Sequence, residues 1–326
     1  MALEVLKGKT AFVTGAASGI GQGIAQACGN AGMNVILVDL RAKALAEAAV
    51  WFEQKGYPHH TIELDVTDRA GYAKAADNAE AKFGKVHLLV NNAGVEVPMV
   101  PLWKSTYDDI DFITGVNIHG VLNGIVTFVP RMLNYGEAAH VVNTSSQSGL
   151  SVVPGATLYN LTKAAIAAMT ETLKGDLKGT NVDASVFAPG PVQGNLSVTS
   201  YEVRPESLGN KAEIPVFAPP PEVNPAEISP TAGFTPQPEL DFSKATISAL
   251  EAGERVLNGV QRGDLYIFTH PEFAPGIKNK YEAMLRAYPA ETKIDPVRTQ
   301  IFEGFFSFLT QNPVYAEQKP VPGFYK

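Results

Sequence analysis

Short apolar and β-branched runs alternate with longer helical patterns through the first 190 residues, and this alternation restricts the fold more than any other feature. Two of the runs, Val-Ile-Leu-Val at residues 35–38 and Leu-Leu-Val at residues 88–90, are continuously apolar. Such runs are expected of strands that helices cover on both faces. The pattern therefore predicts an α/β fold with a doubly wound parallel sheet of about seven strands. The expected strands cover residues 10–14, 34–40, 61–66, 87–91, 140–145, 182–188 and 264–269, and the expected helices cover residues 19–31, 43–55, 69–83, 107–133, 158–178, 243–259, 276–288 and 295–309.

The length of 326 residues allows one large α/β domain or two smaller ones. No internal repeat is present, and no stretch suggests a separate second core. We therefore expect a single domain over residues 1–326. Its parts are a cofactor-binding and catalytic core at 6–195, a substrate lid at 196–240, and a last helix, last strand and C-terminal extension at 241–326.

The segment at residues 201–238 contains nine prolines, including a triplet at 219–221. Proline lacks a backbone donor and fixes φ, so regular helix or central strand is not expected there. The segment is either an active-site lid or a disordered linker. Apolar side chains such as Phe217 and Phe234 could anchor it to the body of the protein, and this favours the lid.

Composition excludes several classes of protein. The net charge of −7 argues against a nucleic-acid partner, which would require a basic surface. No apolar run approaches the roughly 18 residues of a membrane span, and the N-terminus has no secretory h-region, so neither membrane association nor secretion is expected. The single cysteine, Cys28, fits a reducing cytoplasm and a role as a buried filler. The six histidines have no carboxylate or cysteine partners at ligand spacing, so no metal site is expected.

A glycine-rich turn follows the first expected strand and opens the first helix, with Gly15, Gly19 and Gly21 in the pattern Gly-x-x-x-Gly-x-Gly. Glycines let the backbone turn tightly and let a pyrophosphate approach the N–H groups at the positive end of the helix. Many strand–helix junctions carry glycine for packing alone. The position at the first βα crossover nevertheless favours a dinucleotide site.

Two acidic residues extend this site. Asp39 ends the second expected strand, where a carboxylate can accept from the adenosine ribose hydroxyls and repel a 2′-phosphate, which favours NAD over NADP. Arg41 lies two residues further on and could soften that preference. Asp65, expected to end the third strand, could meet the adenine. Asn-Asn-Ala-Gly at 91–94 supplies short polar groups and a glycine where the sheet opens towards a ligand.

Three residues form a proton-transfer group in outline. Ser146 stands thirteen residues before Tyr159, and Lys163 follows Tyr159 by four. If Tyr159 opens a helix, Lys163 lies one turn later on the same face. A neighbouring cation lowers the pKa of a tyrosine, so the phenol could accept a proton near neutral pH while the serine holds a substrate oxygen.

As an ordered set, these motifs resemble the short-chain dehydrogenase/reductase family. The resemblance covers residues 6–195 and, more loosely, the last strand, and it implies a Rossmann-type fold and a nicotinamide dinucleotide cofactor. The matching positions, in family order, are residues 14–21, residues 91–94, Asn117, Ser146, Tyr159, Lys163 and Pro189-Gly190.

The resemblance also implies roles. Tyr159 would be the base in oxidation and the acid in reduction, and Ser146 would hold the substrate oxygen. Lys163 would lower the tyrosine pKa and bind the nicotinamide ribose, while Asn117 would keep a helix kink and a water relay behind the lysine. The residues expected to bind the cofactor are Gly15, Ser18, Gly19, Ile20, Gly21, Asp39, Asp65, Val66, Asn92, Ala93, Gly94, Tyr159, Lys163, Pro189, Gly190 and Val192.

Two features qualify the match. The family usually places a threonine four residues after the glycine of Pro-Gly, where it binds the nicotinamide carboxamide, but this chain has Gly194 there, and Asn195 or backbone groups would have to substitute. A second Tyr-x-x-x-Lys, from Tyr315 to Lys319, lies in the C-terminal tail without a serine at the matching distance. The Tyr-Lys spacing alone therefore carries little weight.

Residues 105–132 and the long C-terminal extension are similar to bacterial Cα-dehydrogenases, which oxidise benzylic alcohols of lignin-derived aryl ethers. The first hypothesis is thus an NAD-dependent dehydrogenase of a bulky aromatic or cyclic secondary alcohol. The alternatives are a carbonyl reductase of the same fold and a non-catalytic regulator that senses dinucleotide. A small-molecule alcohol or ketone is the expected partner, and the helices at 105–134 and 155–178 are expected to form a homodimer or homotetramer.

Overall fold

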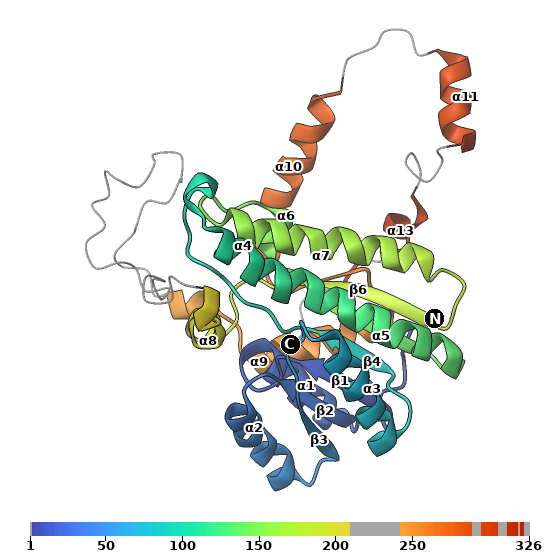
Figure 1. The fold of residues 1–326 in the computed structure, drawn as a ribbon. Helices are drawn as coiled ribbons and strands as arrows, with labels where there is room; N and C mark the ends of the chain where they lie inside the picture. Colours follow the sequence, from blue (N-terminus) through green and yellow to red (C-terminus); the bar gives the residue numbers. More distant parts are fainter. Residues whose placement is uncertain (1, 209–241, 289–294, 306–311, 319, 323–326) are drawn as a thin grey trace.

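Seven parallel strands form one sheet with the order β3-β2-β1-β4-β5-β6-β7, which confirms the doubly wound fold predicted from the alternation (Figure 1). The computed structural model describes residues 2–208, 242–288, 295–305, 312–318 and 320–322. Strand order reverses between β1 and β4, which are neighbours in the sheet, and ligand sites of such folds lie beyond the carboxyl ends of strands at this reversal. The strands are β1 (Thr10–Thr14), β2 (Asn34–Asp39), β3 (His59–Glu63), β4 (Leu88–Asn91), β5 (Ala139–Thr144), β6 (Val182–Ala188) and β7 (Tyr266–Phe268).

Helices cover both faces of the sheet. Successive strand side chains point to opposite faces, so Phe12 joins the cluster beneath one helical layer and Val13 joins the cluster beneath the other. This two-sided burial explains why the strands read as unbroken apolar runs. One layer contains α1 (Gly19–Asn30), α2 (Ala42–Lys55) and α9 (Ala249–Arg262), and the other contains α3 (Arg69–Phe83), α5 (Gly120–Tyr135) and α7 (Thr157–Asp176).

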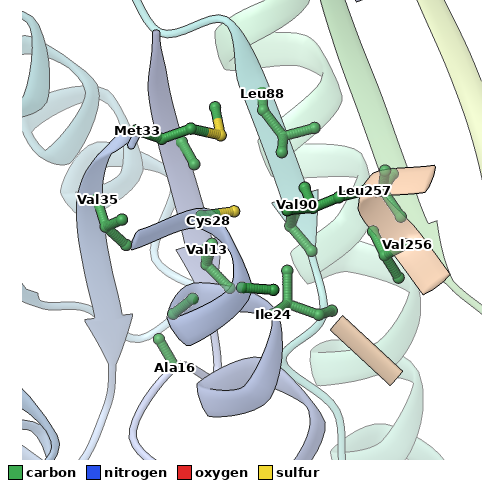
Figure 2. Close-up of a cluster of buried hydrophobic side chains, with 14 of the residues drawn as sticks. Val13, Ala16, Ile24, Cys28, Met33, Val35, Leu88, Val90, Val256 and Leu257 are labelled. Carbon is green, nitrogen blue, oxygen red and sulfur yellow. The ribbon is translucent and has the colours of Figure 1, made fainter. Parts of the chain in front are cut away.

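Figure 2 shows the cluster between the sheet and the first of these layers, where Ile24 and Cys28 of α1 meet Val13 and Val90 of the strands. Cys28 is fully buried, and burial raises the pKa of its thiol to about 12. A protonated, inaccessible thiol is unreactive, so its predicted role as a small core residue is confirmed by its burial.

Glycines allow α1 and α9 to pack closely where the two helices cross. A Cβ added to Gly23 would lie 1.9 Å from the carbonyl oxygen of Ala249, and one added to Gly253 would lie 2.4 Å from the carbonyl oxygen of Gly23. The two helix backbones are therefore in direct contact. This contact fixes α1, whose first turn borders the glycine-rich loop, against the C-terminal half of the chain.

The bounds predicted for the third strand, residues 61–66, are wrong. β3 pairs with β2 from Val35 opposite His59 to Asp39 opposite Glu63, so its ladder ends where β2 ends. Asp65 consequently lies in the loop after the strand and not at its end. β7 is likewise shorter than predicted, because it pairs only with the last residues of β6.

The helix predicted over residues 107–133 is helical throughout but not regular. It consists of α4 (Tyr107–Thr114), a π-helical segment η2 (Gly115–His119) and α5. By length and composition alone this 29-residue stretch would qualify as a membrane span, contrary to the expectation that no apolar run approaches one. Its most apolar window is 44% buried inside the fold, where Phe128 and Met132 of α5 belong to the core.

Part of the expected lid is helical. α8 (Leu196–Val203) and η3 (Glu206–Leu208) begin it, whereas residues 209–241, which hold most of the proline-rich stretch, lie outside the described residues. The helix expected at 243–259 begins later, at α9. Helices α10 (Ala274–Arg286) and α11 (Pro296–Phe305) extend away from the sheet (Figure 1). The remaining elements are α6 (Gln147–Leu150), α13 (Pro313–Ala316), η1 (Leu102–Lys104), η6 (Phe242–Ala245) and η7 (Pro271–Phe273).

Candidate active site

A cleft of about 560 Å³ opens at the carboxyl ends of the strands, beside the reversal between β1 and β4. It is lined by every residue predicted to bind the cofactor except Gly21, and also by Ser146. Asn117 and Gly21 lie behind its wall. The structure thus brings the sequence-predicted residues to one place, from Asp39 at one end to Tyr159 and Lys163 at the other.

The glycine-rich turn forms the floor of the cleft. Gly15 and Gly19 have φ values of 67° and 51°, a region that L side chains rarely adopt. Gly21 packs behind them, since a Cβ there would lie 2.1 Å from the carbonyl oxygen of Gly15. The turn leaves the N-terminal N–H groups of α1 facing the cleft, and these suit a pyrophosphate.

Thr14 joins this turn to the loop after β4, a role that the sequence did not reveal. Its hydroxyl oxygen accepts from the backbone N–H groups of Asn92 and Ala93, each at 3.0 Å. The side-chain amide of Asn92 in turn donates to the Thr14 carbonyl at 3.1 Å. The two loops that border the cleft are therefore held as one unit.

Asp39 lies at the adenosine end and is already engaged by the protein. One carboxylate oxygen accepts from the backbone of Ala17 at 3.1 Å, and the other accepts from the backbone and side chain of Arg41. Arg41 also donates to the Ser18 hydroxyl at 2.9 Å. Arg41 is thus part of this end of the cleft, which places a cation beside the expected ribose-binding carboxylate.

Asp65 occupies a turn at the same end. Its carboxylate accepts from the backbone N–H and the hydroxyl of Thr67, at 2.8 and 2.7 Å. Asp65 and Val66 line the cleft although β3 has ended two residues earlier.

The proton-transfer group lies at the opposite end. Ser146 follows β5 and caps α6, Tyr159 is the third residue of α7, and Lys163 is one turn later. Lys163 is only 4% exposed, and its ammonium donates to the Thr144 carbonyl at 3.0 Å. The ammonium lies 5.5 Å from the centroid of the Tyr159 ring.

Burial governs the pKa values here. Desolvation lowers the pKa of Lys163 to about 8 and raises that of Tyr159. The negative charge of Glu96 raises the Tyr159 pKa further, while a hydrogen bond with Ser146 opposes the rise. Burial therefore keeps the pKa of Tyr159 above its ordinary value in the protein by itself, and the expected lowering of this pKa by Lys163 stays a prediction.

Asn117 is fully buried in the π-helical segment and acts as a strut. Its side-chain oxygen accepts from the backbone N–H of Val95 at 2.8 Å, and its amide donates to the Val95 carbonyl at 2.9 Å and to the Thr162 hydroxyl at 3.1 Å. The implied irregularity at Asn117 is present as this π segment, a feature common at functional sites.

Ser145 borders the cleft beside Ser146, but its hydroxyl is bonded to α7. It is 1% exposed, and its hydroxyl donates to the Lys163 carbonyl at 2.7 Å. It therefore fixes α7 to the end of β5, so the two neighbouring serines have separate roles.

Helix α8 forms one wall of the cleft. The sequence did not predict this helix. Leu196, Thr199 and Val203 line the cleft. The helix ends at Arg204, whose fully buried side chain pairs with Asp109 at 3.2 Å. The uneven composition of the segment gave no periodic signal of this helix.

Glu96 follows the loop after β4 and is partly buried beneath α8. Its carboxylate accepts from the Ser197 hydroxyl, and its backbone N–H donates to the Ser200 oxygen at 2.9 Å. Met99 and Glu96 line the same small cavity.

Gly194 lies against the glycine-rich turn. A Cβ there would be 3.4 Å from the Cα of Gly19, an ordinary contact, so packing does not demand glycine at this position. Gln193 and Asn195, on either side, line the cleft.

The tail copy of the Tyr-Lys spacing is separate from the cleft. Tyr315 is half exposed, and its hydroxyl donates to Glu171 at 2.7 Å. Across the described ranges, no three His, Cys, Asp or Glu side chains group as metal ligands would.

A parallel doubly wound sheet with a glycine-floored cleft, an acidic residue at one end and a buried Ser-Tyr-Lys group at the other defines a nicotinamide-dependent oxidoreductase. The chain belongs to the short-chain dehydrogenase/reductase family: the family model described as short chain dehydrogenase matches residues 9–204. The chain is an oxidoreductase acting on CH–OH groups with a nicotinamide dinucleotide cofactor.

Similar proteins agree with this assignment. The chain is 33% identical to a C alpha-dehydrogenase of Sphingobium sp. strain SYK-6, over 90% of this chain and 91% of that protein. It is 30% identical to a 1-deoxy-11-beta-hydroxypentalenate dehydrogenase of Streptomyces avermitilis, over 86% and 92%. A short-chain dehydrogenase/reductase from Burkholderia phymatum, solved in complex with NAD, superposes with a TM-score of 0.74 at 32% identity, over 89% and 99%. The apo form of LigD from Sphingobium sp. strain SYK-6 gives 0.69 at 31% identity, over 88% and 100%.

We predict that Lys163→Met stabilises the fold at pH 7 by about 1–3 kcal/mol, because it removes a buried ammonium whose charge is disfavoured. The pKa of Lys163 is lowered on folding, so the unfolded chain binds more protons between pH 8 and 10.5 and wild-type stability rises with pH in that window. The advantage of the variant should therefore shrink as pH rises from 8 to 10. Urea unfolding at pH 7, 8.5 and 10 measures it.

The matched control is Lys174→Met on the same helix. Lys174 is equally buried but paired with Asp183, so its loss leaves an uncompensated carboxylate and should destabilise the protein. A Lys163→Met variant that loses stability as Lys174→Met does would contradict the prediction.

Proposed function

We propose that the protein oxidises a bulky secondary alcohol, aromatic or cyclic, to the ketone with NAD⁺. The observation that carries this proposal is the meeting of Ser146, Tyr159 and the buried Lys163 at one end of the dinucleotide cleft. A binding module has no need for a phenol, a hydroxyl and a buried cation together where the nicotinamide would lie.

Each residue of the site has a separate role in this reaction. The bound nicotinamide supplies the hydride acceptor. The Ser146 hydroxyl holds the substrate oxygen, and the Tyr159 phenolate accepts the alcohol proton. Lys163 contributes positive charge beside the tyrosine ring, 5.5 Å from its centroid, and would hold the nicotinamide ribose. Asn117 holds the loop carrying Val95 and the helix carrying Lys163 in register.

The second candidate is reduction of a ketone by the same site. Burial and Glu96 raise the Tyr159 pKa, and this favours the protonated phenol that reduction requires. The alternative of a non-catalytic regulator depends on Gly194, which replaces the family's carboxamide-binding threonine. A side chain at this position would make only ordinary contacts. We propose that Asn195 or the backbone beside it holds the carboxamide instead.

The substrate class follows from the relatives. Those named C alpha-dehydrogenase and 1-deoxy-11-beta-hydroxypentalenate dehydrogenase match most of this chain. Together with the apolar residues Phe112, Val203 and Leu208 along the cleft, they support a benzylic or cyclic secondary alcohol as the substrate.

We predict that Tyr159→Phe lowers kcat for aryl carbinols by about 10²–10⁴-fold, because it removes the proton acceptor. Binding of NADH should change little, since the phenyl ring remains. NADH absorbance with a panel of aryl carbinols and fluorescence titration with NADH measure the two effects. Tyr315→Phe in the tail, the same substitution at the same motif spacing, is the control and should retain full activity. Equal losses in both variants, or none in Tyr159→Phe, would rule out the assigned role.

For the cofactor we propose NAD over NADP. The Asp39 carboxylate lies where a 2′-phosphate would meet it, although Arg41 stands within 3.1 Å of that carboxylate. The balance between the two side chains sets the preference.

We predict that Asp39→Ser lowers the NAD-to-NADP ratio of kcat/KM by about 10-fold or more, since it removes the repulsion and frees Arg41 for a phosphate. Steady-state kinetics with both cofactors measures it. Asp65→Asn changes the other carboxylate at this end and should leave the ratio within about two-fold. An unchanged ratio in Asp39→Ser would show that this carboxylate does not discriminate.

We further propose a homodimer or homotetramer built through α5 and α7, whose outer faces carry exposed apolar residues. Val126 is 71% exposed, and Leu122, Leu133 and Leu161 are also exposed. Exposed apolar residues of this kind, gathered on neighbouring helices, support an interface.

We predict a solution mass of two or four chains, which Val126→Lys should reduce because it places a charge in the interface. Light scattering after size exclusion measures it. Val5→Lys, at a valine that is 67% exposed outside these helices, should leave the mass unchanged. A monomeric wild type would contradict the proposal.

A further inference from the structure

A second cavity of about 180 Å³ adjoins the cleft, and Tyr159 lines both. Its wall is mainly apolar, with Val97, Met99, Val153 and Leu158 among the lining residues. An apolar cavity of about 150 Å³ in another protein holds one benzene molecule. This cavity therefore has room for about one aromatic ring beside the reacting carbon.

Among the described residues that line this cavity, Glu96 and Tyr159 are the two that titrate. Burial raises the pKa of Glu96. In the part of the chain that the structure describes, Ser197 is its one hydrogen-bond donor, and it reaches only the Oε1 atom. The Oε2 atom is not among the buried side-chain atoms that lack a partner, so it remains accessible to a donor group of a ligand in the cavity.

The carboxyl is fixed in position from α8. Ser197 bonds the side chain of Glu96, and Ser200 accepts from its backbone N–H. The buried pair of Arg204 with Asp109 holds the end of the same helix. A preorganised acceptor of this kind discriminates between ligands better than a mobile one.

We propose that Glu96 is a specificity-determining residue whose Oε2 atom accepts a hydrogen bond from a second, neutral hydroxyl group of the substrate. The preferred substrates are then secondary alcohols with a one-ring arm in the small cavity and a second hydroxyl within reach of Glu96. This inference rests on the proposed alcohol oxidation.

A neutral hydroxyl fits the site better than a charged group. A substrate carboxylate would be repelled by Glu96. An ammonium group would lose its hydration on entering the cavity, and burial disfavours the anionic carboxylate that could pair with it. A hydroxyl group can hydrogen-bond to either the protonated or the ionised carboxyl, and it loses less hydration free energy on entry.

The test compares kcat/KM on matched alcohols. The parent is 1-phenylethanol, and the hydroxylated probes are 1-phenylethane-1,2-diol and the 3- and 4-hydroxyphenyl analogues. At least one of these should exceed the parent by about 10-fold or more in the wild type, as expected for a hydrogen bond to a charged group. Glu96→Leu should bring that ratio to within about two-fold of one, because it keeps the bulk and removes the acceptor. Mandelate and 2-amino-1-phenylethanol, which carry a carboxylate and an ammonium group, should not exceed the hydroxylated probe.

A purely structural role for Glu96 is tested separately. Ser200→Ala breaks the other bond between α8 and residue 96 but keeps the carboxyl, so the preference should persist. Glu96→Gln removes the charge that raises the Tyr159 pKa, so the acid limb of the oxidation profile should move to lower pH, and Ser200→Ala should leave it in place. A preference that survives in Glu96→Leu, or a wild type that prefers the parent or the ammonium probe, would overturn the proposal.

Binding without turnover separates this inference from the proposed function. In Tyr159→Phe saturated with NADH, calorimetry should show tighter binding of the preferred hydroxylated ketone than of acetophenone, and the added Glu96→Leu change should abolish the difference. If this preference exists but no alcohol is oxidised, the proposed function fails and the Glu96 subsite stands. If 1-phenylethanol is oxidised without any such preference, the proposed function stands and the Glu96 subsite fails.

Discussion

The geometry of the site depends on the hydrogen bonds made by the buried side chain of Asn117. By bonding both backbone groups of Val95 and the hydroxyl of Thr162, it joins the loop after β4 to the helix that carries Tyr159 and Lys163. Three hydrogen bonds offset the free-energy cost of burying this polar side chain in the core. The helix around Asn117 is a π-helical segment. Asn117 therefore tethers the start of the loop after β4 to the core.

Burial in a medium of low dielectric constant then determines the protonation of the groups in the site. The same burial lowers the pKa of Lys163, raises that of Tyr159 and raises that of Glu96, so all three groups are pushed towards their neutral forms. A bound positive nicotinamide would act against this trend at Tyr159 and would favour the phenolate. Proton transfer would then be coupled to cofactor binding.

Helix α8 connects the two ends of the site. It holds Glu96 through Ser197 and Ser200, and Glu202 lies 3.8 Å from Arg41 at the adenosine end. Arg204 anchors it to α4. A single short helix thus contacts the residues that we expect to select both substrate and cofactor, which gives a physical basis for linking the two choices.

The sequence by itself determined the seven-stranded sheet and the glycine-rich turn, because strand burial and turn chemistry show in local patterns. The set of Asn117, Ser146, Tyr159 and Lys163 came from the resemblance to the family. The sequence misplaced the third strand, since that ladder ends with its partner at Asp39 and not with its own apolar run. It also gave no sign that burial raises the pKa of Tyr159. Desolvation and the approach of Glu96 depend on residues far apart in the chain, and only tertiary structure brings them together. The roles of Thr14, α8 and Glu96 were decided in the same way, by long-range contacts that no local pattern records.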